Sequence, residues 1–336
     1  MTGGARLRLG ACLSLSGRFA PFGIQAANAL KIWSELDGAV DVMIEDDRSD
    51  PGSVDEVLKS VATRCDVLLG PYSTQLVRLA ARTAQASELL LWNHGGSGDD
   101  VEASAPGHLV SIPTPTRHYA EPFVRRVASG DAERALWIQH GRGRFGQQVA
   151  HGAAALARQA GIEATVVGPD ARLEPASRPW QLFVAGTFED DVAAVRQAVE
   201  MSHPPQLVCS VAAGVRSFAT ALGRDPTGTF GVGQWFPGLV PLPELGPDEE
   251  SFLGAYAKAF GGTPDYPAAQ ALGAAVIAAH TTRLAATTSR EVVWSIASQL
   301  DTLTLFGAFA VDPVTGAQRK HEPVLVRWGR GGLTPA

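Results

Sequence analysis

The chain has 336 residues, of which 45% are hydrophobic and 18% charged, and its formal net charge is −6. This length suggests two domains or one large domain, and the hydrophobic content suffices for a buried core, which excludes a disordered chain. A net acidic chain without a basic run also excludes nucleic acid as a partner, because phosphate binding requires clustered positive charge.

The cysteines and the apolar stretches bear on location. Cys12, Cys65 and Cys209 stand beside or within apolar runs and form no C-x-x-C motif, so we expect small buried core residues rather than disulfides. The longest weakly polar stretch, Ala268–Ala279, is about 12 residues, whereas a membrane span needs roughly 20, so we expect no direct membrane insertion. Residues 1–8 lack the apolar region of a signal peptide. Either a leader has been removed or the protein is cytosolic.

Short apolar runs alternate with amphipathic stretches along the first two thirds of the chain. The predicted strands are Leu7–Leu15, Val40–Ile44, Val67–Leu69, Leu89–Trp92, Leu109–Ile112, Ala135–Ile138, Ala164–Val167, Leu182–Ala185, Leu207–Val211 and Thr229–Val232. The predicted helices between them include Gly23–Leu36, Gly52–Ala62, Gln75–Ala86, Arg117–Ala128, Gly146–Gln159, Asp190–Glu200 and Val215–Leu222. Such alternation is typical of parallel sheets with right-handed crossovers, and ten strands fit two α/β lobes better than one.

The pattern changes after Val232. A proline-rich connector, Trp235–Pro247, leads into three consecutive predicted helices, Asp248–Phe260, Tyr266–Leu284 and Arg290–Leu300. Two short strands follow, Gly307–Val311 and Pro323–Trp328, which we expect to pair across a turn at Asp312–Gly316. Because consecutive helices cannot extend a sheet, they are expected to pack back on an earlier lobe.

Two enzyme motifs are incomplete. Gly141, Gly143 and Gly146 match G-x-G-x-x-G between a strand and a helix, but the acidic residue that would hold a ribose is missing near the end of the next strand. His94-Gly95-Gly96 follows a strand as an oxyanion-hole segment would, but no G-x-S-x-G nucleophile motif occurs. The eight histidines form no H-x-x-x-H or Cys/His cluster. We therefore expect no catalytic residues, no cofactor and no metal.

Hydroxyl, amide and aromatic side chains recur where strands end, the edge at which open α/β sheets bind ligands. These residues are Phe22 with Gly23, Tyr72-Ser73-Thr74, Asn93 through Ser97 (including Gly96), Phe145, Phe188 and Gln234-Trp235. Ser73 and Thr74 fall at the start of a predicted helix, where free N–H groups and the helix dipole suit a carboxylate. The aromatic rings offer flat walls for an apolar body. This set predicts a site that holds a small molecule without reacting with it.

The ordered series of these motifs resembles a known family. Leu13-Ser-Leu-Ser-Gly17, Phe22-Gly23, Asp46-Asp47-Arg-Ser-Asp50-Pro51, Leu69-Gly-Pro-Tyr-Ser-Thr74, Leu89-Leu-Leu-Trp-Asn93, the Arg-Phe-Gly146 loop and Phe306-Gly-Ala-Phe-Ala-Val-Asp312 occur in sequence. Together they resemble the type I periplasmic binding proteins of the Leu/Ile/Val-binding family, the solute receptors of branched-chain amino acid ABC importers.

The resemblance implies a fold and a division of the chain. The fold would be two doubly wound parallel-sheet lobes joined by a three-crossing hinge, closing on a ligand in the cleft between them. Lobe one would comprise residues 1–116 and 237–305, and lobe two residues 117–236 and 306–336. The implied partners are a small-molecule ligand and an ABC permease, and the implied location is extracytoplasmic.

The resemblance also implies roles for individual residues. Thr74 with Ser73 matches the hydroxyl position that holds an amino acid's α-carboxylate, and Gly96 and Ser97 match contacts from the next loop. Phe22 and Phe145 stand where branched-chain amino acid binders have tyrosines, and Phe188 matches another aromatic of lobe two. Closure would bring Phe145, Phe188 and Trp235 from lobe two onto the ligand.

Gln234 departs from the family, because it stands where those binders use a glutamate to pair the ligand's ammonium group. An amide offers only a dipole, so burying an ammonium there without a carboxylate is expected to cost several kcal/mol. Glu189 or Asp190 remains a possible substitute. The hypothesis is a ligand with a carboxylate or amide head and an apolar or aromatic body.

Two functional interpretations stay open. The first is a non-enzymatic solute receptor that delivers an amino acid, amide or aromatic acid to an ABC importer. The second is a cytosolic ligand-sensing regulator on the same fold, resembling the amide sensor of the amidase operon, which the absent leader and unpaired cysteines favour.

Overall fold

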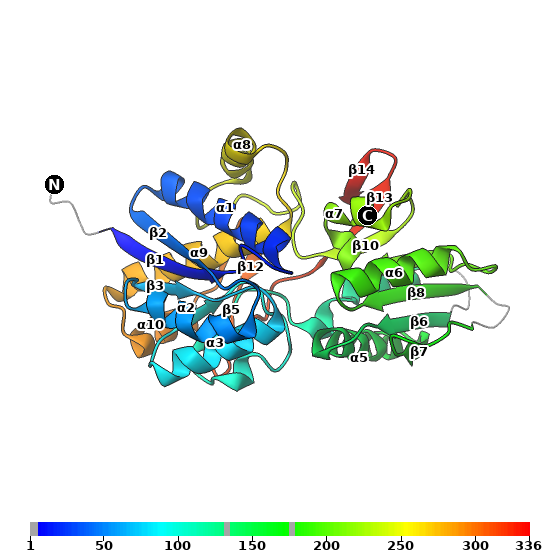
Figure 1. Cartoon of the computed structure of the whole chain (residues 1–336), viewed down its shortest axis with the longest axis horizontal. Helices are drawn as coiled ribbons and strands as arrows, with labels where there is room; N and C mark the ends of the chain where they lie inside the picture. The colour runs from blue at the N-terminus through cyan, green and yellow to red at the C-terminus, as the bar shows by residue number, and fades with distance from the viewer. Residues whose placement is uncertain (1–5, 131–134, 175–178) are drawn as a thin grey trace. The chain divides into compact units, whose positions relative to one another are not determined.

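The structure is a computed structural model that describes residues 6–130, 135–174 and 179–336. The chain divides into two compact units, shown in Figure 1. Unit 1 comprises Met1–Thr114 and Trp235–Glu322, and unit 2 comprises Pro115–Gln234 and Pro323–Ala336. Each unit is an α/β domain with its own sheet, which confirms the predicted fold class.

Unit 1 is built on a five-stranded sheet of order β2-β1-β3-β4-β5, in which every pairing is parallel. Its strands are β1 (Leu7–Leu13), β2 (Val40–Asp46), β3 (Val67–Leu69), β4 (Leu91–Asn93) and β5 (Leu109–Ser111). The main helices are α1 (Ala20–Asp37), α2 (Pro51–Ala62), α3 (Thr74–Ala86), α8 (Glu249–Phe260), α9 (Tyr266–Ala285) and α10 (Arg290–Ala297), and η1 (Glu102–Ser104) is a 3₁₀ turn. The strand order reverses direction between β1 and β3, so the loops after these strands flank the position where doubly wound sheets bind ligands.

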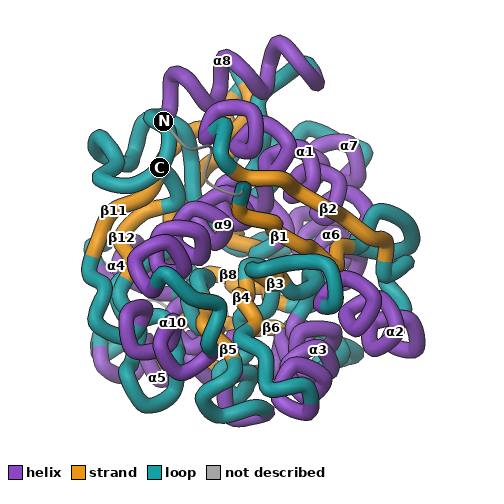
Figure 2. The backbone as a smooth tube through the Cα atoms, turned by 90° about the vertical axis from the view of Figure 1, so that its left-hand side faces the viewer, coloured by secondary structure: helices purple, strands orange, loops and turns teal. Residues whose placement is uncertain are grey.

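Local sequence explains where these helices begin. Asp50 caps α2 by accepting from the Gly52 N–H, and Pro51 occupies the first helical position, where a missing N–H has no consequence. The long helix α9 is buried over most of its length and packs against α1. The helix α9 therefore packs within unit 1, and Figures 1 and 2 both show it beside α1.

Unit 2 is built on a seven-stranded sheet of order β14-β13-β10-β9-β8-β6-β7. Its strands are β6 (Ala135–His140), β7 (Glu163–Val167), β8 (Trp180–Ala185), β9 (Leu207–Ser210), β10 (Phe230–Gly233), β13 (Val324–Gly329) and β14 (Gly332–Pro335). Its helices are α4 (Glu121–Ala128), α5 (Arg144–Gln159), α6 (Phe188–Val199) and α7 (Ser217–Leu222), with 3₁₀ turns η2 (Thr116–His118) and η3 (Ala212–Gly214). One hydrophobic cluster lies among α4, α5 and the sheet, and a second among α6, α7 and the sheet.

The end of the chain differs from the prediction. Gly307–Val311 and Pro323–Trp328 do not pair with each other. Instead β12 (Gly307–Phe309) pairs antiparallel with β11 (Thr302–Thr304) in unit 1, whereas β13 pairs antiparallel with β10 in unit 2. The hairpin β11–β12 therefore keeps residues 306–322 in unit 1, although the prediction had assigned these residues to lobe two.

The unit boundaries also shift at the second crossing, which falls between Gln234 and Trp235 rather than after residue 236. Trp235 therefore belongs to unit 1, and the expectation that lobe two carries it is wrong. In the described parts of both units, no helix combines the length and apolar character that a membrane span requires.

Candidate functional site

The loop between β3 and α3 prepares a helix N-terminus for an anion. Ser73 is the N-cap of α3, and its hydroxyl accepts from the Leu76 N–H at 3.4 Å. Its backbone has a positive φ of 87°, and its own N–H donates to the Gly95 carbonyl at 3.1 Å, which ties this loop to the one after β4. The first turn of α3 contains no acidic residue. The positive end of the helix dipole is therefore not neutralised from within the helix.

Asn93 organises the neighbouring loop after β4. Its Nδ2 donates to the Gly96 carbonyl at 2.6 Å and to the Ser111 hydroxyl at 2.8 Å, while Oδ1 accepts from the N–H groups of Gly95 at 3.1 Å and Gly96 at 2.8 Å. Two donor bonds and two accepted bonds use the ordinary capacity of an amide side chain. We correct the prediction for Asn93: it holds the loop in place and has no group left for a ligand.

Close packing explains the glycines of this loop. A Cβ on Gly96 would lie 2.8 Å from Cβ of Val77 on α3, and one on Gly95 would lie 2.7 Å from Cα of Tyr72. Only glycine, which has no side chain, allows the two loops to approach each other this closely. Ser97 follows directly and is buried, 6% exposed. The structure thus brings Ser73, Thr74, Gly96 and Ser97 onto two adjoining loops of unit 1.

Aromatic rings adjoin the same loops. Phe22, in the first turn of α1, stacks on Tyr72 with ring centroids 4.7 Å apart and planes 4° apart. The Tyr72 hydroxyl lies 3.3 Å from the hydroxyl of Tyr266, at the start of α9, and Phe19 meets the Tyr72 ring at 6.2 Å. The sequence did not indicate Tyr266, although it begins a predicted helix, because it lies 194 positions from Tyr72.

In unit 2, a second aromatic group surrounds Gln234. The Gln234 side chain, which follows β10 and is 2% exposed, donates from Nε2 to the Tyr119 hydroxyl. The Tyr119 ring meets Phe145 edge to face, with centroids 5.6 Å apart and planes at 84°. The structure therefore links Gln234 and Phe145 through Tyr119, which the sequence did not indicate because it lies 115 positions from Gln234.

Phe188 packs against a different hydrophobic cluster of unit 2 from Phe145, and Trp235 belongs to unit 1. Phe188 is the first residue of α6 and packs against the cluster among α6, α7 and the sheet, whereas Phe145 packs against the cluster on α4 and α5. Trp235 is 3% exposed in unit 1.

The carboxylates near Phe188 already have structural partners. Asp190 forms a capping box with Thr187 at the start of α6 and also accepts from the Arg142 N–H at 3.3 Å. Asp191 is 1% exposed, and its Oδ2 accepts from the Ser210 hydroxyl at 3.0 Å and the Ala212 N–H at 2.9 Å. Burial raises the pKa of Asp191 to about 7, against the opposing effect of these hydrogen bonds. Asp190 and Asp191 are thus engaged within unit 2, and the pairing of an ammonium group by Glu189 or Asp190 stays a prediction.

The two incomplete motifs have structural explanations. A Cβ on Gly141 would lie 2.7 Å from Cα of Gly186, and one on Gly146 would lie 2.5 Å from the Ala185 carbonyl oxygen, so these glycines let the loop after β6 approach the end of β8. His94 is fully buried, and a backbone hydrogen bond with Gly70 only partly offsets the effect of burial on its ring. Burial lowers the pKa of His94 to about 4. It is a neutral core residue and presents no donor to a substrate.

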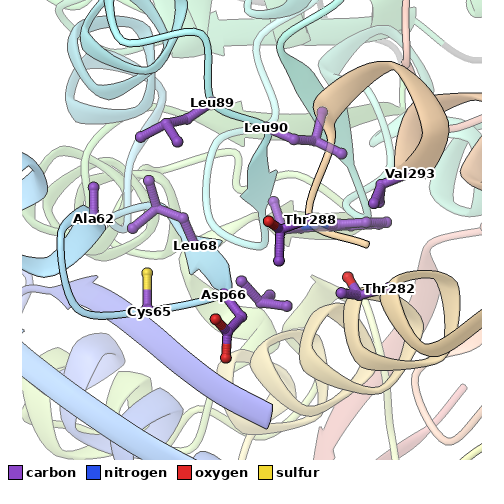
Figure 3. A pocket seen from close by; sticks show the side chains of 11 residues that line it. Ala62, Cys65, Asp66, Leu68, Leu89, Leu90, Thr282, Thr288 and Val293 are labelled. Atoms are coloured by element: carbon purple, nitrogen blue, oxygen red, sulfur yellow. The ribbon is translucent and has the colours of Figure 1, made fainter. Parts of the chain in front are cut away.

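A small cavity in unit 1 lies at the other edge of the sheet. It measures about 90 Å³, and Figure 3 shows the side chains around it. Those side chains are Ala62, Cys65, Asp66, Val67, Leu68, Leu89, Leu90, Trp92, Thr282, Thr288 and Val293. Several of them precede or begin β3 and β4, whereas the predicted ligand residues follow these strands. The cavity is therefore separate from the candidate site. Among the described residues, no three His, Cys, Asp or Glu side chains gather as a metal site requires.

With the geometry in place, comparisons with known proteins decide the family. The family model described as periplasmic binding protein matches residues 6–332. The chain belongs to the periplasmic binding protein family. This membership confirms the family predicted from the ordered motifs, and its fold is that of solute-binding receptors. No curated protein sequence is significantly similar to this binding protein.

Solved structures of this family share the fold at low sequence identity. A leucine-binding protein from Thermotoga maritima is 12% identical, with a TM-score of 0.82 over 98% of this chain and 97% of the other. A branched-chain amino acid binding protein from Streptococcus pneumoniae, in complex with isoleucine, is 14% identical, with a TM-score of 0.78 over 98% and 97%. A solute-binding protein from Rhodopseudomonas palustris BisB5, in complex with 3,4-dihydroxybenzoic acid, is 14% identical, with a TM-score of 0.78 over 99% and 96%.

Proposed function

We propose that this periplasmic binding protein is a non-enzymatic solute receptor for an ABC importer, and that it takes a small ligand into a cleft between its two lobes by closure. The ligand carries a carboxylate or amide head and an apolar or aromatic body. An amino acid, an amide or an aromatic acid falls within this class, and an acid or amide without an ammonium group is the favoured member.

The observation that carries the proposal is the N-terminus of α3 beside a stacked aromatic pair. The helix N-terminus is capped by Ser73, free of acidic residues and adjacent to the Gly96–Ser97 loop. In the proposal, Ser73, Thr74, Gly96 and Ser97 bind the carboxylate or amide through hydroxyl and backbone N–H groups. The stacked rings of Phe22 and Tyr72 adjoin these groups and hold the ligand body.

The second lobe is proposed to supply the closing wall and the selectivity. Phe145 and Phe188 lie at the starts of α5 and α6, the helices that follow β6 and β8, and these two strands flank the point where the strand order of the unit 2 sheet reverses. Gln234 donates to Tyr119 and brings no negative charge. Because a buried ammonium requires a compensating charge, this arrangement favours ligands that lack one. A ligand that touches both lobes stabilises the closed state through its differential affinity for it.

The related structures carry both classes of ligand, isoleucine in one and 3,4-dihydroxybenzoic acid in another. The fold therefore does not choose between them, and the site residues of this chain must. A thermal-shift screen separates the classes, with branched-chain and aromatic amino acids, small amides, aromatic carboxylates, and NAD as the control. A ligand at 100 times its Kd stabilises a protein by about 2.7 kcal/mol, which shifts Tm by several degrees.

We expect stabilisation by amides or acids without an ammonium group. A response to leucine-like amino acids alone keeps the receptor function and overturns the selectivity assigned to Gln234. A response to NAD alone overturns the receptor proposal.

The free cysteines favour a second candidate, a cytosolic ligand-sensing regulator on the same fold. Cys12, Cys65 and Cys209 are all unpaired, and burial raises the pKa of each thiol, that of Cys65 to about 11. Free thiols are usual in reducing compartments. Cell fractionation of the natural producer distinguishes the candidates, because an importer receptor is released with the extracytoplasmic fraction, whereas a regulator stays with the cytosol.

A further inference from the structure

The first and third connections between the units leave unit 1 from two segments that are bonded side by side. Unit 1 ends at Thr114 before the first connection and at Glu322 before the third. Upstream of these ends, the Ser111 N–H donates to the Gly316 carbonyl at 3.0 Å, and Gln318 donates from Nε2 to the Ile112 carbonyl at 3.1 Å. We call residues 111–114 and 316–321 the paired segments.

A side-chain bond closes the paired segments at their exit from unit 1. The Thr114 hydroxyl oxygen lies 2.5 Å from Nδ1 of His321, and the same hydroxyl is 3.2 Å from the His321 carbonyl. Nε2 of His321 lies 3.1 Å from the Phe306 carbonyl, and because a carbonyl only accepts, Nε2 carries a proton. In a neutral ring Nδ1 is then the acceptor for the Thr114 hydroxyl. Both residues are buried, Thr114 at 0% and His321 at 8% exposure.

Packing fixes the imidazole in this position. The Phe306 ring stacks on it with centroids 4.0 Å apart and planes 7° apart. Gly307 has a φ of 131°, and a Cβ there would lie 3.1 Å from Cδ2 of His321, so glycine leaves room for the ring. Proline follows each exit point, Pro115 after Thr114 and Pro323 after Glu322, and each fixes its own φ.

We propose that the Thr114–His321 bond is a clasp that makes the paired segments one pre-organised strap, so that the first and third connections move together when the units move relative to each other. Losing the clasp frees the two connections to move independently. The free protein then samples more arrangements of its units, and ordering them on ligand binding costs more conformational entropy. Only the ligand part of this inference rests on the proposed function.

The test compares Thr114→Val, which removes the hydroxyl at similar volume, with Thr114→Ser, which keeps it. Thr281→Val is the matched control: Thr281 is equally buried in unit 1, but its hydroxyl donates to the Ile277 and Ala278 carbonyls of its own helix. Spin labels on the exposed positions Ser87→Cys and Gln159→Cys, one in each unit, report the distribution of distances between the units without ligand.

For Thr114→Val we expect a broader distance distribution and amide exchange at least tenfold faster in residues 316–321, with Thr114→Ser and Thr281→Val like the parent protein. Where a ligand is known, its Kd rises about threefold or more in Thr114→Val alone. Equal distributions and exchange in all variants, or the same change in Thr281→Val, overturn the clasp. If Thr114→Val does not fold, His321→Phe, which keeps the ring stack and loses both nitrogens, takes its place with the same criteria. Failure to find any ligand leaves the distance and exchange measurements decisive.

Discussion

At the scale of single residues, two buried titratable groups act on stability in opposite directions. His94 is fully buried with its pKa lowered to about 4, and Asp191 is 1% exposed with its pKa raised to about 7. In both cases burial disfavours the charged form. Neither group belongs to the proposed ligand contacts, so their effects appear in unfolding experiments on the free protein.

His94 is predicted to make the protein acid-sensitive. The unfolded chain takes up a proton on this residue near pH 6.5, whereas the folded protein does so only near pH 4. Protons therefore favour unfolding in this window, and the stability associated with the neutral ring is present above about pH 6.5 and lost as the pH falls towards 4. Replacing His94 by Asn should flatten the rise of the unfolding free energy between pH 4 and 6.5, measured by urea titration. An unchanged slope would show that the folded protein protonates His94 readily.

Asp191 is predicted to change the stability of the protein with pH in the opposite direction. Its folded pKa of about 7 lies above its ordinary value of 3.8, so the folded state binds the extra proton between these pH values. Its contribution to stability is present below about pH 4 and is lost as the pH rises through 7. An Asp191→Asn variant keeps an acceptor for Ser210 and Ala212 but cannot ionise. The difference in unfolding free energy between this variant and the parent protein should shift in favour of the variant as the pH rises from 4 to 7. A difference that does not change with pH would contradict the raised pKa.

At the scale of elements, the start of α3 combines a cap with a strained backbone. Ser73→Ala loses the cap at Leu76 and keeps a side chain at a φ of 87°, so we expect a loss of about 1–2 kcal/mol in the free energy of unfolding. Ser73→Gly loses the cap but relieves the strain and should cost only a few tenths of a kcal/mol. Chemical denaturation tests this order. Both variants lose the hydroxyl, so both should weaken ligand binding alike if Ser73 holds the ligand.

The close packing of α1 against the end of β1 depends on Gly23. A Cβ there would lie 1.9 Å from the Ser14 carbonyl oxygen, a backbone atom that cannot move aside cheaply. Gly23→Ala is expected to cost several kcal/mol. The control is Gly254→Ala in α8, where a Cβ meets nothing within 4 Å and alanine should stabilise the helix by up to about 1 kcal/mol. Equal Tm values for the two variants would contradict this account of Gly23.

Local signals made most elements predictable. The strand Val67–Leu69 matches its prediction, and Asp50-Pro51 marks the start of α2 because the cap and the proline act within one turn. Predictions failed where partners are distant. β11 and β12 form a hairpin within unit 1, and β13 pairs with a strand almost a hundred residues earlier, so the apolar pattern alone assigned these strands wrong partners.

The candidate site shows the same limit. The hydroxyls of Ser73 and Thr74 were predictable because a strand end and a helix start adjoin in sequence. Tyr266 and Tyr119 were not, because each contacts a residue of its group that lies more than a hundred positions away in the sequence. Asn93 was predicted to contact the ligand, whereas its side chain makes four hydrogen bonds within unit 1. These bonds could not be predicted, because they depend on a loop conformation that no local pattern indicates.

At the scale of the whole molecule, the two units divide the proposed task. Unit 1 supplies the helix N-terminus and the Phe22–Tyr72 pair, and unit 2 supplies Phe145 and the Gln234–Tyr119 pair. The family membership establishes a receptor fold, and the amide at position 234 gives this chain its predicted preference for ligands without an ammonium group.

The most direct test is a calorimetric titration of the full chain with ligand pairs that differ only in the α-ammonium group: 4-methylpentanoate against leucine, and 3-phenylpropanoate against phenylalanine. The account predicts that the acid of each pair binds at least tenfold more tightly than its amino acid. It also predicts that Gln234→Glu weakens the binding of the acid. Tighter binding of leucine or phenylalanine by the unaltered protein would contradict the central claim.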